Sequence, residues 1–399
     1  MKQKRTWIRK ITGTAACLLA AVMILAGAFP QAASAAADGT PVYSSVDLFT
    51  DRDLAQEADL SEAAYMTVSD GQEVRITEAG VYVLSGTAAN AAIYVEAPDD
   101  AKVQLVLQGL QVTNTDFPVI YVVSADKVFI TTAGDSTLAV TGTFRADGDT
   151  GTDGVIFSRQ DLTLNGTATL TITSTDNGVV CKDDLKITGG TYVISAKSKA
   201  FEANDSIRVA GGAFTLQAGT DGLHAENSDN DSKGYIWIGG GTLDITGGDD
   251  GIHAASVVQI DDGEITISAS EGIEGTFIQL NGGTISIAAA DDGINAANKS
   301  TAVEVAIEFN GATVNVAMAA GDTDGIDSNG NLYINGGVIS VTGNSTFDYD
   351  GTVSFTGGTV YINGQQTASI PNQMMGGGGG WGVNGSWGIS GSRGGRGGW

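Results

Sequence analysis

Short runs in which apolar and polar residues alternate fill most of this chain. Leu185-Lys186-Ile187 and Ile278-Gln279-Leu280 are two examples. Alternation of this kind is typical of β-strands that bury one face. Pairs of glycine, such as Gly189-Gly190 and Gly282-Gly283, separate the runs and permit sharp corners between strands. We therefore predict many short strands and no long helix after the N-terminal apolar run.

A second motif recurs at intervals of 21 to 32 residues and consists of a polar residue, a glycine and an apolar residue. Its copies begin at Asp153, Asn177, Asp221, Asp250, Glu271, Asp292 and Asp324, and Lys199-Ala200-Phe201 takes the same place with alanine for glycine. One such coil cannot bury its apolar face alone, whereas stacked coils can. We predict an all-β fold, a right-handed parallel β-helix, with the handedness taken from the usual crossover of parallel strands. A nonapeptide calcium β-roll has too short a period, and a β-propeller would need blades of about 40 residues.

Composition divides the chain into four parts. Residues 1–35 resemble a secretory signal peptide, because a cationic start precedes an apolar core and the small-residue segment Ala33-Ser34-Ala35. That core is too short for a good membrane span. We assign residues 36–69 to an N-terminal capping segment and residues 70–373 to the β-helix. Residues 374–399 form a Gly/Trp-rich tail whose composition cannot bury a core and predicts disorder.

The formal net charge of −26 over 399 residues becomes more negative once the cationic leader is removed. Such a surface attracts cations and repels nucleic acid and acidic membranes. Cys181 would be the one cysteine of the mature chain, so no disulfide within the chain is expected. We expect a secreted, extracellular monomer, with association at the cell surface left open, and no membrane partner after signal cleavage.

Stacking turns the polar residue of the motif into a column, because equivalent positions of adjacent coils lie about 4.8 Å apart. Two carboxylates at that spacing repel by roughly 1 kcal/mol in water and by about 3.5 kcal/mol at an effective dielectric constant of 20. Oxygen-rich anionic clusters suit Ca²⁺, so we predict calcium as the cofactor. The predicted ligands are Asp221, Asp249, Asp250, Glu271, Asp291, Asp292 and Asp324. The alternative is that these residues only form Asx-turns before glycine.

The residue that follows the apolar one points outward by strand alternation. In successive coils this position reads Glu202, His224, His253, Glu274, Asn295 and Asp327. Both histidines of the chain therefore fall in adjacent coils. They are candidates, together with Glu274, for a carbohydrate-binding groove or a transition-metal site. A solvated polar edge is the alternative.

A second outward row lies on the strand before each glycine pair. It reads Lys186, Arg208, Trp237, Gln259 and Gln279, and Tyr333 follows two coils later. A basic pair beside an exposed tryptophan suits a sugar that carries carboxylates, because the cations pair with uronate and the ring stacks on the pyranose. Lys186, Arg208, Trp237 and Gln259 are therefore candidate carbohydrate-binding residues. The alternative is a surface row in which Trp237 packs beneath the insertion at 228–234.

The sequence resembles a family of secreted bacterial carbohydrate-binding domain-containing proteins with a pectate-lyase-like β-helix. The resemblance covers nearly all of the mature chain and rests on Phe49-Thr50-Asp51-Arg52-Asp53-Leu54, Gly80-Val81-Tyr82-Val83-Leu84-Ser85-Gly86, Val103-Gln104-Leu105-Val106-Leu107, Lys182-Asp183-Asp184-Leu185-Lys186-Ile187 and the Asp-Gly-Ile coils. It implies binding of plant-cell-wall polysaccharides, including polygalacturonate and cellulose, with calcium held by coil aspartates. At matching positions it adds Asp153, Asp183 and Asp184 to the implied ligands. The coil at 198–204 has lost its Asp-Gly and departs from the pattern.

Three functions stay open at this point. The first is a polysaccharide-binding protein without catalytic residues, stabilised by calcium. The second is a polyuronate lyase, which needs Ca²⁺ and a basic residue, for which Lys182, Lys186 and Arg208 are candidates. The third is a structural protein of the cell surface. No Ser-His-Asp set, phosphate loop or cysteine-based zinc motif is present in the sequence.

Overall fold

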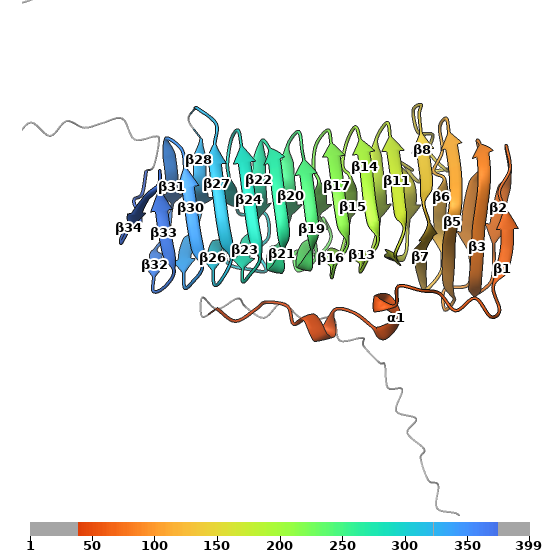
Figure 1. The fold of residues 1–399 in the computed structure, drawn as a ribbon, viewed down its shortest axis with the longest axis horizontal. Coiled ribbons are helices and arrows are strands. Elements are labelled where there is room, and N and C mark those ends of the chain that lie inside the picture. Colours follow the sequence, from red (N-terminus) through yellow and green to blue (C-terminus); the bar gives the residue numbers. More distant parts are fainter. Residues whose placement is uncertain (1–38, 322, 374–399) are drawn as a thin grey trace, which may run out of the picture. The chain divides into compact units, whose positions relative to one another are not determined.

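The computed structural model describes residues 39–321 and 323–373, and it shows a parallel β-helix, as predicted (Figure 1). The signal peptide assigned to 1–35 and the tail assigned to 374–399 lie outside the described residues. The strands form one sheet of 22 members and one of 12. Adjacent coils pair in parallel, and one antiparallel pair, β33 with β34, follows the last described coil.

The smaller sheet takes one strand from each coil. Its members are β2 (Glu73–Ile76), β4 (Ala92–Glu96), β6 (Ile120–Ser124), β9 (Gly154–Ser158), β12 (Asn177–Cys181), β15 (Phe201–Ala203), β18 (Leu223–Ala225), β20 (Asp250–Ala254), β22 (Glu271–Gly275), β25 (Ile294–Ala296), β28 (Asp324–Ser328) and β31 (Ser345–Tyr349). The repeated Gly-containing motif lies at β9, β12, β18, β20, β22, β25 and β28.

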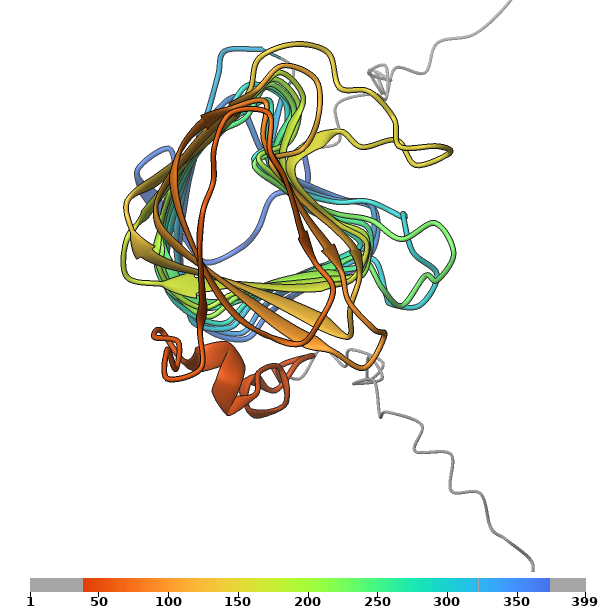
Figure 2. The ribbon, with the colours of Figure 1, turned by 90° about the vertical axis from the view of Figure 1, so that its right-hand side faces the viewer.

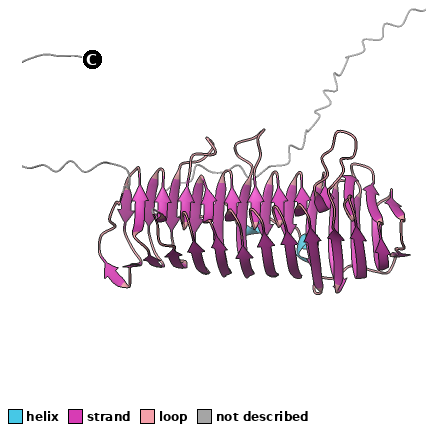
Figure 3. Ribbon diagram, turned by 90° about the horizontal axis from the view of Figure 1, so that it is seen from above, coloured by secondary structure: helices cyan, strands magenta, loops and turns pink. Residues whose placement is uncertain are grey.

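The larger sheet takes two strand segments from most coils. Its members are β1 (Ala64–Thr67), β3 (Gly80–Ala89), β5 (Lys102–Asn114), β7 (Lys127–Gly134), β8 (Ser136–Val140), β10 (Asp161–Gly166), β11 (Thr169–Ser174), β13 (Asp184–Ile187), β14 (Thr191–Ala196), β16 (Ser206–Val209), β17 (Ala213–Ala218), β19 (Tyr235–Thr246), β21 (Val257–Ala269), β23 (Phe277–Leu280), β24 (Thr284–Ala289), β26 (Ala306–Phe309), β27 (Thr313–Met318), β29 (Asn331–Ile334), β30 (Val338–Thr342), β32 (Val353–Phe355), β33 (Thr359–Ile362) and β34 (Gln365–Thr367). Figure 3 shows that strands and the turns between them make up nearly all of the described chain. None of the helices in the described residues is long and apolar enough to cross a membrane.

Inward side chains stack into apolar columns that form one continuous core. On the smaller sheet the column after the motif glycine is fully buried and consists of Val179, Phe201, Leu223, Ile252, Ile273, Ile294, Ile326 and Phe347. Each burial contributes about 1.5–3 kcal/mol. The glycines are required by close approach, because a Cβ on Gly272 would lie 2.3 Å from the carbonyl oxygen of Gly293.

The N-terminal segment differs from the predicted cap. Residues 39–56, which we call the strap, lie along the outside of the larger sheet rather than over the end of the coils (Figures 1 and 2). The strap contains the 3₁₀ helix η1 (Ser45–Asp47) and the short helix α1 (Asp51–Leu54). Thr50 caps α1, with its hydroxyl accepting from the backbone of Asp53 while the Asp53 carboxylate accepts from the backbone of Thr50.

Candidate functional site

The predicted glycan-binding row on the larger sheet is covered by the strap. Lys186, Arg208, Trp237 and Gln259 do point outward and stand in register on adjacent coils. Their exposed fractions are nevertheless only 9%, 8%, 4% and 0%. The expectation of an exposed row is therefore wrong, because alternation sets the direction of a side chain and not what lies above it. We call these four residues and Gln279 the covered row.

The covered row binds the strap as a partner strand would. The side-chain amide of Gln259 accepts from the backbone N–H of Tyr43 at 2.7 Å and donates to its carbonyl at 3.0 Å. Gln279 accepts in the same way from Val42. Trp237 lies 5.6 Å from the ring of Phe49, measured between centroids. The row thus holds a segment of its own chain.

Asp53 fastens the strap with a buried charge cluster. Its carboxylate lies 2.5 Å from Nζ of Lys127 and 3.3 Å from Nζ of Lys186, and it accepts from the hydroxyl of Thr163 at 2.9 Å. Burial alone would raise the pKa of Asp53, but the bonds from Lys127 and the Thr50 backbone and the charges of both lysines hold that pKa well below its usual range. All three candidate lyase bases are paired with carboxylates. Lys186 pairs with Asp53, Arg208 with Asp184 at 2.7 Å and Lys182 with Glu202 at 2.7 Å.

The smaller sheet carries the second outward column, which we call the outer ladder. Its members are Tyr94, Tyr121, Phe157, Val180, Glu202, His224, His253, Glu274, Asn295, Asp327 and Asp348, each opposite the next. One sheet thus changes from aromatic to ionic along its length.

The predicted acidic column stands beside the ionic half of the outer ladder. Asp221, Asp250, Glu271, Asp292 and Asp324 make up this acidic column, and Asp250 is directly opposite Glu271. The backbone N–H of Asp250 donates to the carboxylate of Asp221 in the preceding coil at 3.2 Å. In the same way, the backbone N–H of Asp324 donates to the carboxylate of Asp292 at 3.3 Å. The motif aspartates therefore bind backbone as well as facing one another.

Crowding raises the pKa values of Glu271 and Asp292 in the acidic column. Burial, followed by the charges of Glu274, Asp250 and Asp292, raises the pKa of Glu271 to about 7 despite a bond from Asn295. Burial and the nearby charges of Asp291 and Asp324 raise the pKa of Asp292 to about 6.

Unpartnered oxygen atoms occur in and beside the acidic column. Among the described residues, Oδ1 of Asn295, Asp324 and Asp348 is buried and has no hydrogen-bond partner. An all-oxygen, anionic donor set of this kind matches the preference of Ca²⁺. Asp249 and Asp291 lie next to the acidic column but are exposed.

Three other implied calcium ligands are not brought to the acidic column. The repeat predicted that Asp153 lies opposite Asn177. In the structure Gly154 takes that position, so Asp153 is one residue out of register. Asp184 occupies the next corner, where Ser206 and Arg208 bind its two oxygens at 2.6 and 2.7 Å. Asp183 precedes it there, and burial and a hydrogen bond with Asp205 raise its pKa to about 7.

The two histidines do come together. Their rings stack at 4.5 Å between centroids with 21° between planes. Nδ1 of His253 lies 2.6 Å from Asp250 and 2.9 Å from Glu274, and Glu274 also pairs with Lys299 at 2.9 Å. Burial lowers the pKa of His253, but the bonds and charges of Asp250 and Glu274 outweigh it and raise the pKa to about 9.

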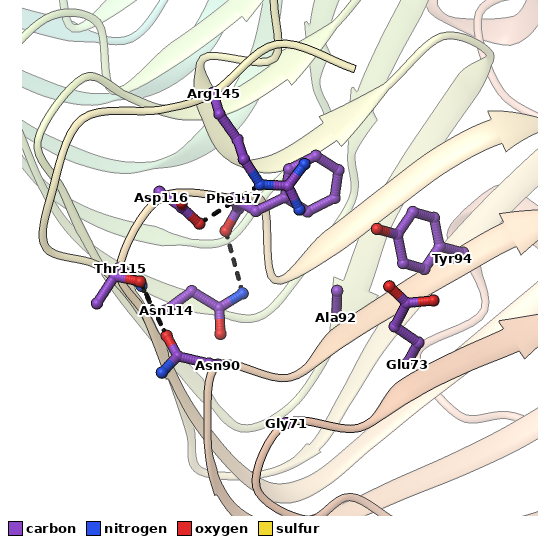
Figure 4. A pocket seen from close by; sticks show the side chains of 10 residues that line it. All are labelled: Gly71, Glu73, Asn90, Ala92, Tyr94, Asn114, Thr115, Asp116, Phe117 and Arg145. Atoms are coloured by element: carbon purple, nitrogen blue, oxygen red, sulfur yellow. Dashed lines mark hydrogen bonds and ion pairs between the residues drawn. The ribbon is translucent and has the colours of Figure 1, made fainter. Parts of the chain in front are cut away.

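The N-terminal coils hold a pocket that sequence reasoning missed. It has a volume of about 200 Å³ and is lined by Gly71, Glu73, Asn90, Ala92, Tyr94, Asn114, Thr115, Asp116, Phe117 and Arg145 (Figure 4). We call it the aromatic pocket. The signal was available, because Tyr94 and Tyr121 occupy outward positions between buried aliphatic residues.

Rings and hydrogen-bonding groups meet in the aromatic pocket. Tyr94 and Phe117 lie 5.7 Å apart with 31° between planes, and the guanidinium of Arg145 lies 4.0 Å from the Phe117 centroid. Arg145 also forms an exposed ion pair with Asp116 at 3.6 Å. Asn114 is 3% exposed and its Oδ1 has no hydrogen-bond partner among the described residues. Aromatic rings beside planar polar groups suit a sugar ring and its hydroxyls.

The fold and this pocket define the class, a parallel β-helix with a surface site of sugar-binding character. A family model described as carbohydrate-binding domain-containing protein matches residues 70–276, just over half of the chain. The protein therefore belongs to the carbohydrate-binding domain-containing family. The matched range contains the aromatic pocket and both histidines, whereas Asp292 and Asp324 lie beyond it.

Two known proteins are similar to this chain. A carbohydrate-binding domain-containing protein of Acetivibrio thermocellus is 36% identical over 136 residues, which are 33% of this chain and 47% of that protein. The matched region thus spans about half the length of that relative. A solved structure described as the polysaccharide lyase-like protein from C. thermocellum, gadolinium derivative, has a TM-score of 0.45 and 25% identity, covering 75% of this chain and 96% of its own.

Proposed function

We propose that this protein is exported, binds calcium on its acidic column and binds acidic plant-cell-wall polysaccharide in the aromatic pocket without cleaving it. The observation that carries the proposal is the aromatic pocket, in a chain of a carbohydrate-binding family. Tyr94 and Phe117, which are 8% and 4% exposed, form the apolar base of the pocket rather than open stacking faces, and Oδ1 of Asn114 accepts a sugar hydroxyl. Arg145 can exchange its exposed partner Asp116 for a uronate carboxylate.

Calcium supports this function by neutralising the acidic column. Asp292 and Asp324, with Oδ1 of Asn295, are the oxygens that would hold the ion. Bound Ca²⁺ offsets the repulsion between stacked carboxylates and so stabilises the coils next to it. Export is supported by the leader pattern of residues 1–35, and N-terminal sequencing of protein recovered from the medium tests it.

The glycan proposal is tested by Arg145→Gln in the full mature chain. Affinity electrophoresis in polygalacturonate gels should show retarded wild-type protein and faster migration of the variant. Arg159→Gln is the matched control, because Arg159 is also exposed but lies outside the pocket. Cellulose pull-down measures the neutral glycan in parallel. Equal retardation of all three proteins, or ultraviolet-absorbing unsaturated products from polygalacturonate, would contradict the proposal.

The calcium proposal has its own test. Titration calorimetry should detect calcium uptake by the wild-type protein and weaker uptake by Asp324→Asn. Asp244→Asn, an exposed aspartate on β19, should bind calcium like the wild type. No heat of binding in the wild type, or equal binding by both variants, would exclude the acidic column as the site.

A further inference from the structure

The coils that carry the two histidines repeat one local arrangement. Asp221-Gly222-Leu223-His224 and Asp250-Gly251-Ile252-His253 place a carboxylate three residues before an imidazole. In both coils Nδ1 of the imidazole lies next to that carboxylate, at 2.8 Å for His224 and 2.6 Å for His253. Because His224 is opposite His253 in the parallel ladder, the two rings point the same way.

Nδ1 of His253 is hydrogen-bonded to Asp250, whereas Nδ1 of His224 faces Asp221 at 2.8 Å without a hydrogen bond among the described residues. Both Nδ1 atoms therefore point at a carboxylate, which leaves the two Nε2 atoms as the ring ligands for an ion. Nε2 of His224 lies 3.4 Å from the carboxylate of Glu226. One ligand atom from each of His224, Glu226 and His253 lies within 4.8 Å of the others. The side chain of Glu226 is 59% exposed, so it is free to adjust its position around an ion.

The surface beside these atoms is hollow rather than filled. A cavity of about 180 Å³ borders His224 and Glu226. It provides space for water or another ligand next to two of the three donors, His224 and Glu226. Three protein donors beside an open position are typical of zinc sites that accept an exogenous ligand.

We infer that His224, His253 and Glu226 form a binding site for a divalent transition-metal ion of the zinc or copper type. Imidazole nitrogens suit these ions, whereas calcium prefers oxygen donors, so the site is distinct from the acidic column. Asp221 and Asp250 act as positioning residues, since a carboxylate on Nδ1 fixes the tautomer and ring orientation of a metal-binding histidine. The ion would replace any proton on Nε2 and bridge two coils.

The histidine content of the chain makes the test unusually clean. The sequence contains only these two histidines, so in protein prepared without a histidine tag any imidazole signal must come from them. Zinc titration calorimetry in excess calcium should give one site per chain. Electron paramagnetic resonance of the copper-loaded protein should show coupling to two imidazole nitrogens.

Variants separate ligands from positioning residues. His224→Gln and His253→Gln should lose zinc binding and reduce the copper signal to one imidazole nitrogen. Asp250→Asn should lower zinc affinity by roughly tenfold to a hundredfold while both nitrogens remain coupled. Glu264→Gln, an exposed glutamate on β21, is the control and should bind like the wild type.

Some results would overturn the inference. They are the absence of zinc binding in calcium-saturated wild-type protein, a copper spectrum without nitrogen coupling, or unchanged binding in both histidine variants. Glu226→Gln keeps the test valid if a histidine variant fails to fold, because the exposed Glu226 side chain contributes little to packing. A calcium titration run alongside should be unaffected by Glu226→Gln, which distinguishes this site from the proposed calcium site.

Discussion

Two outward columns of polar side chains run along this β-helix, one on each sheet. The covered row on the larger sheet is closed by the strap, which matches its glutamines and cations with backbone groups and a buried carboxylate. The ionic half of the outer ladder has no such segment and keeps buried oxygens without hydrogen-bond partners among the described residues. Both columns have the same stacking geometry. Where another segment of the chain supplies hydrogen-bonding and charged partners, as the strap does, the column becomes a buried contact within the protein. Where the chain does not supply all of them, buried oxygens remain without partners, and we propose that ions bind there.

The largest expected effect comes from Asp53→Ala, which removes the charge cluster that holds the strap against the larger sheet. The change leaves Lys127 and Lys186 largely buried without their counter-charge, and removal of one partner from a buried pair costs about 3–5 kcal/mol. Urea unfolding should show this loss, and limited proteolysis should cut within residues 39–56. Asp51→Ala, exposed on the same helix, should change neither measurement. A variant with wild-type stability and a protease-resistant strap would show that the charge cluster does not fasten it.

The stabilisation that ionised Asp53 gives to the folded protein should disappear in acid. Since the folded state lowers the pKa of Asp53, its stabilisation is complete above the ordinary aspartate pKa of about 3.9 and is lost as the pH falls toward the lower folded value. The difference in unfolding free energy between wild type and Asp53→Ala should therefore be constant near neutrality and shrink below about pH 4. A difference that grows on acidification would contradict the assigned sign.

The smallest expected effect concerns the acidic column and reverses with calcium. At pH 8 in chelator, Asp292→Asn should stabilise the protein by about 1 kcal/mol, because one of the stacked charges is removed. In calcium the same variant should be less stable than the wild type, because a proposed ligand is lost. Thermal melts in the two buffers measure both signs. Asp244→Asn should show no reversal, and a variant that behaves alike in both buffers would remove Asp292 from the proposed site.

The sequence was most informative where the motif is regular. Between Asp221 and Ile326 the repeated glycine and apolar residues predicted the register, because each departure would turn a buried column toward solvent. Asp153 was placed one residue out because the irregular stretch before β9 interrupts the repeat.

The strap and the aromatic pocket depend on contacts that periodicity does not encode. The bond between Tyr43 and Gln259 joins residues 216 positions apart, and nothing in the alternation around Gln259 distinguishes a covered amide from an exposed one. The pocket likewise requires Arg145, from an irregular loop, to lie over Phe117. Local pattern predicted the coils, and docking of irregular segments determined which faces stay accessible.

The position of the strap in the sequence also determines when it can dock during folding. Ribosomes make Tyr43 long before its partners, since its acceptor Gln259 and the Glu308 carboxylate bound by Gly39 are separated from the strap by more than 200 residues. The segment cannot complete its docking until the coils through β26 have stacked, because its binding surface does not exist earlier. Docking is thus a late event whose completion reports that the coil array beneath it has been assembled in the correct register.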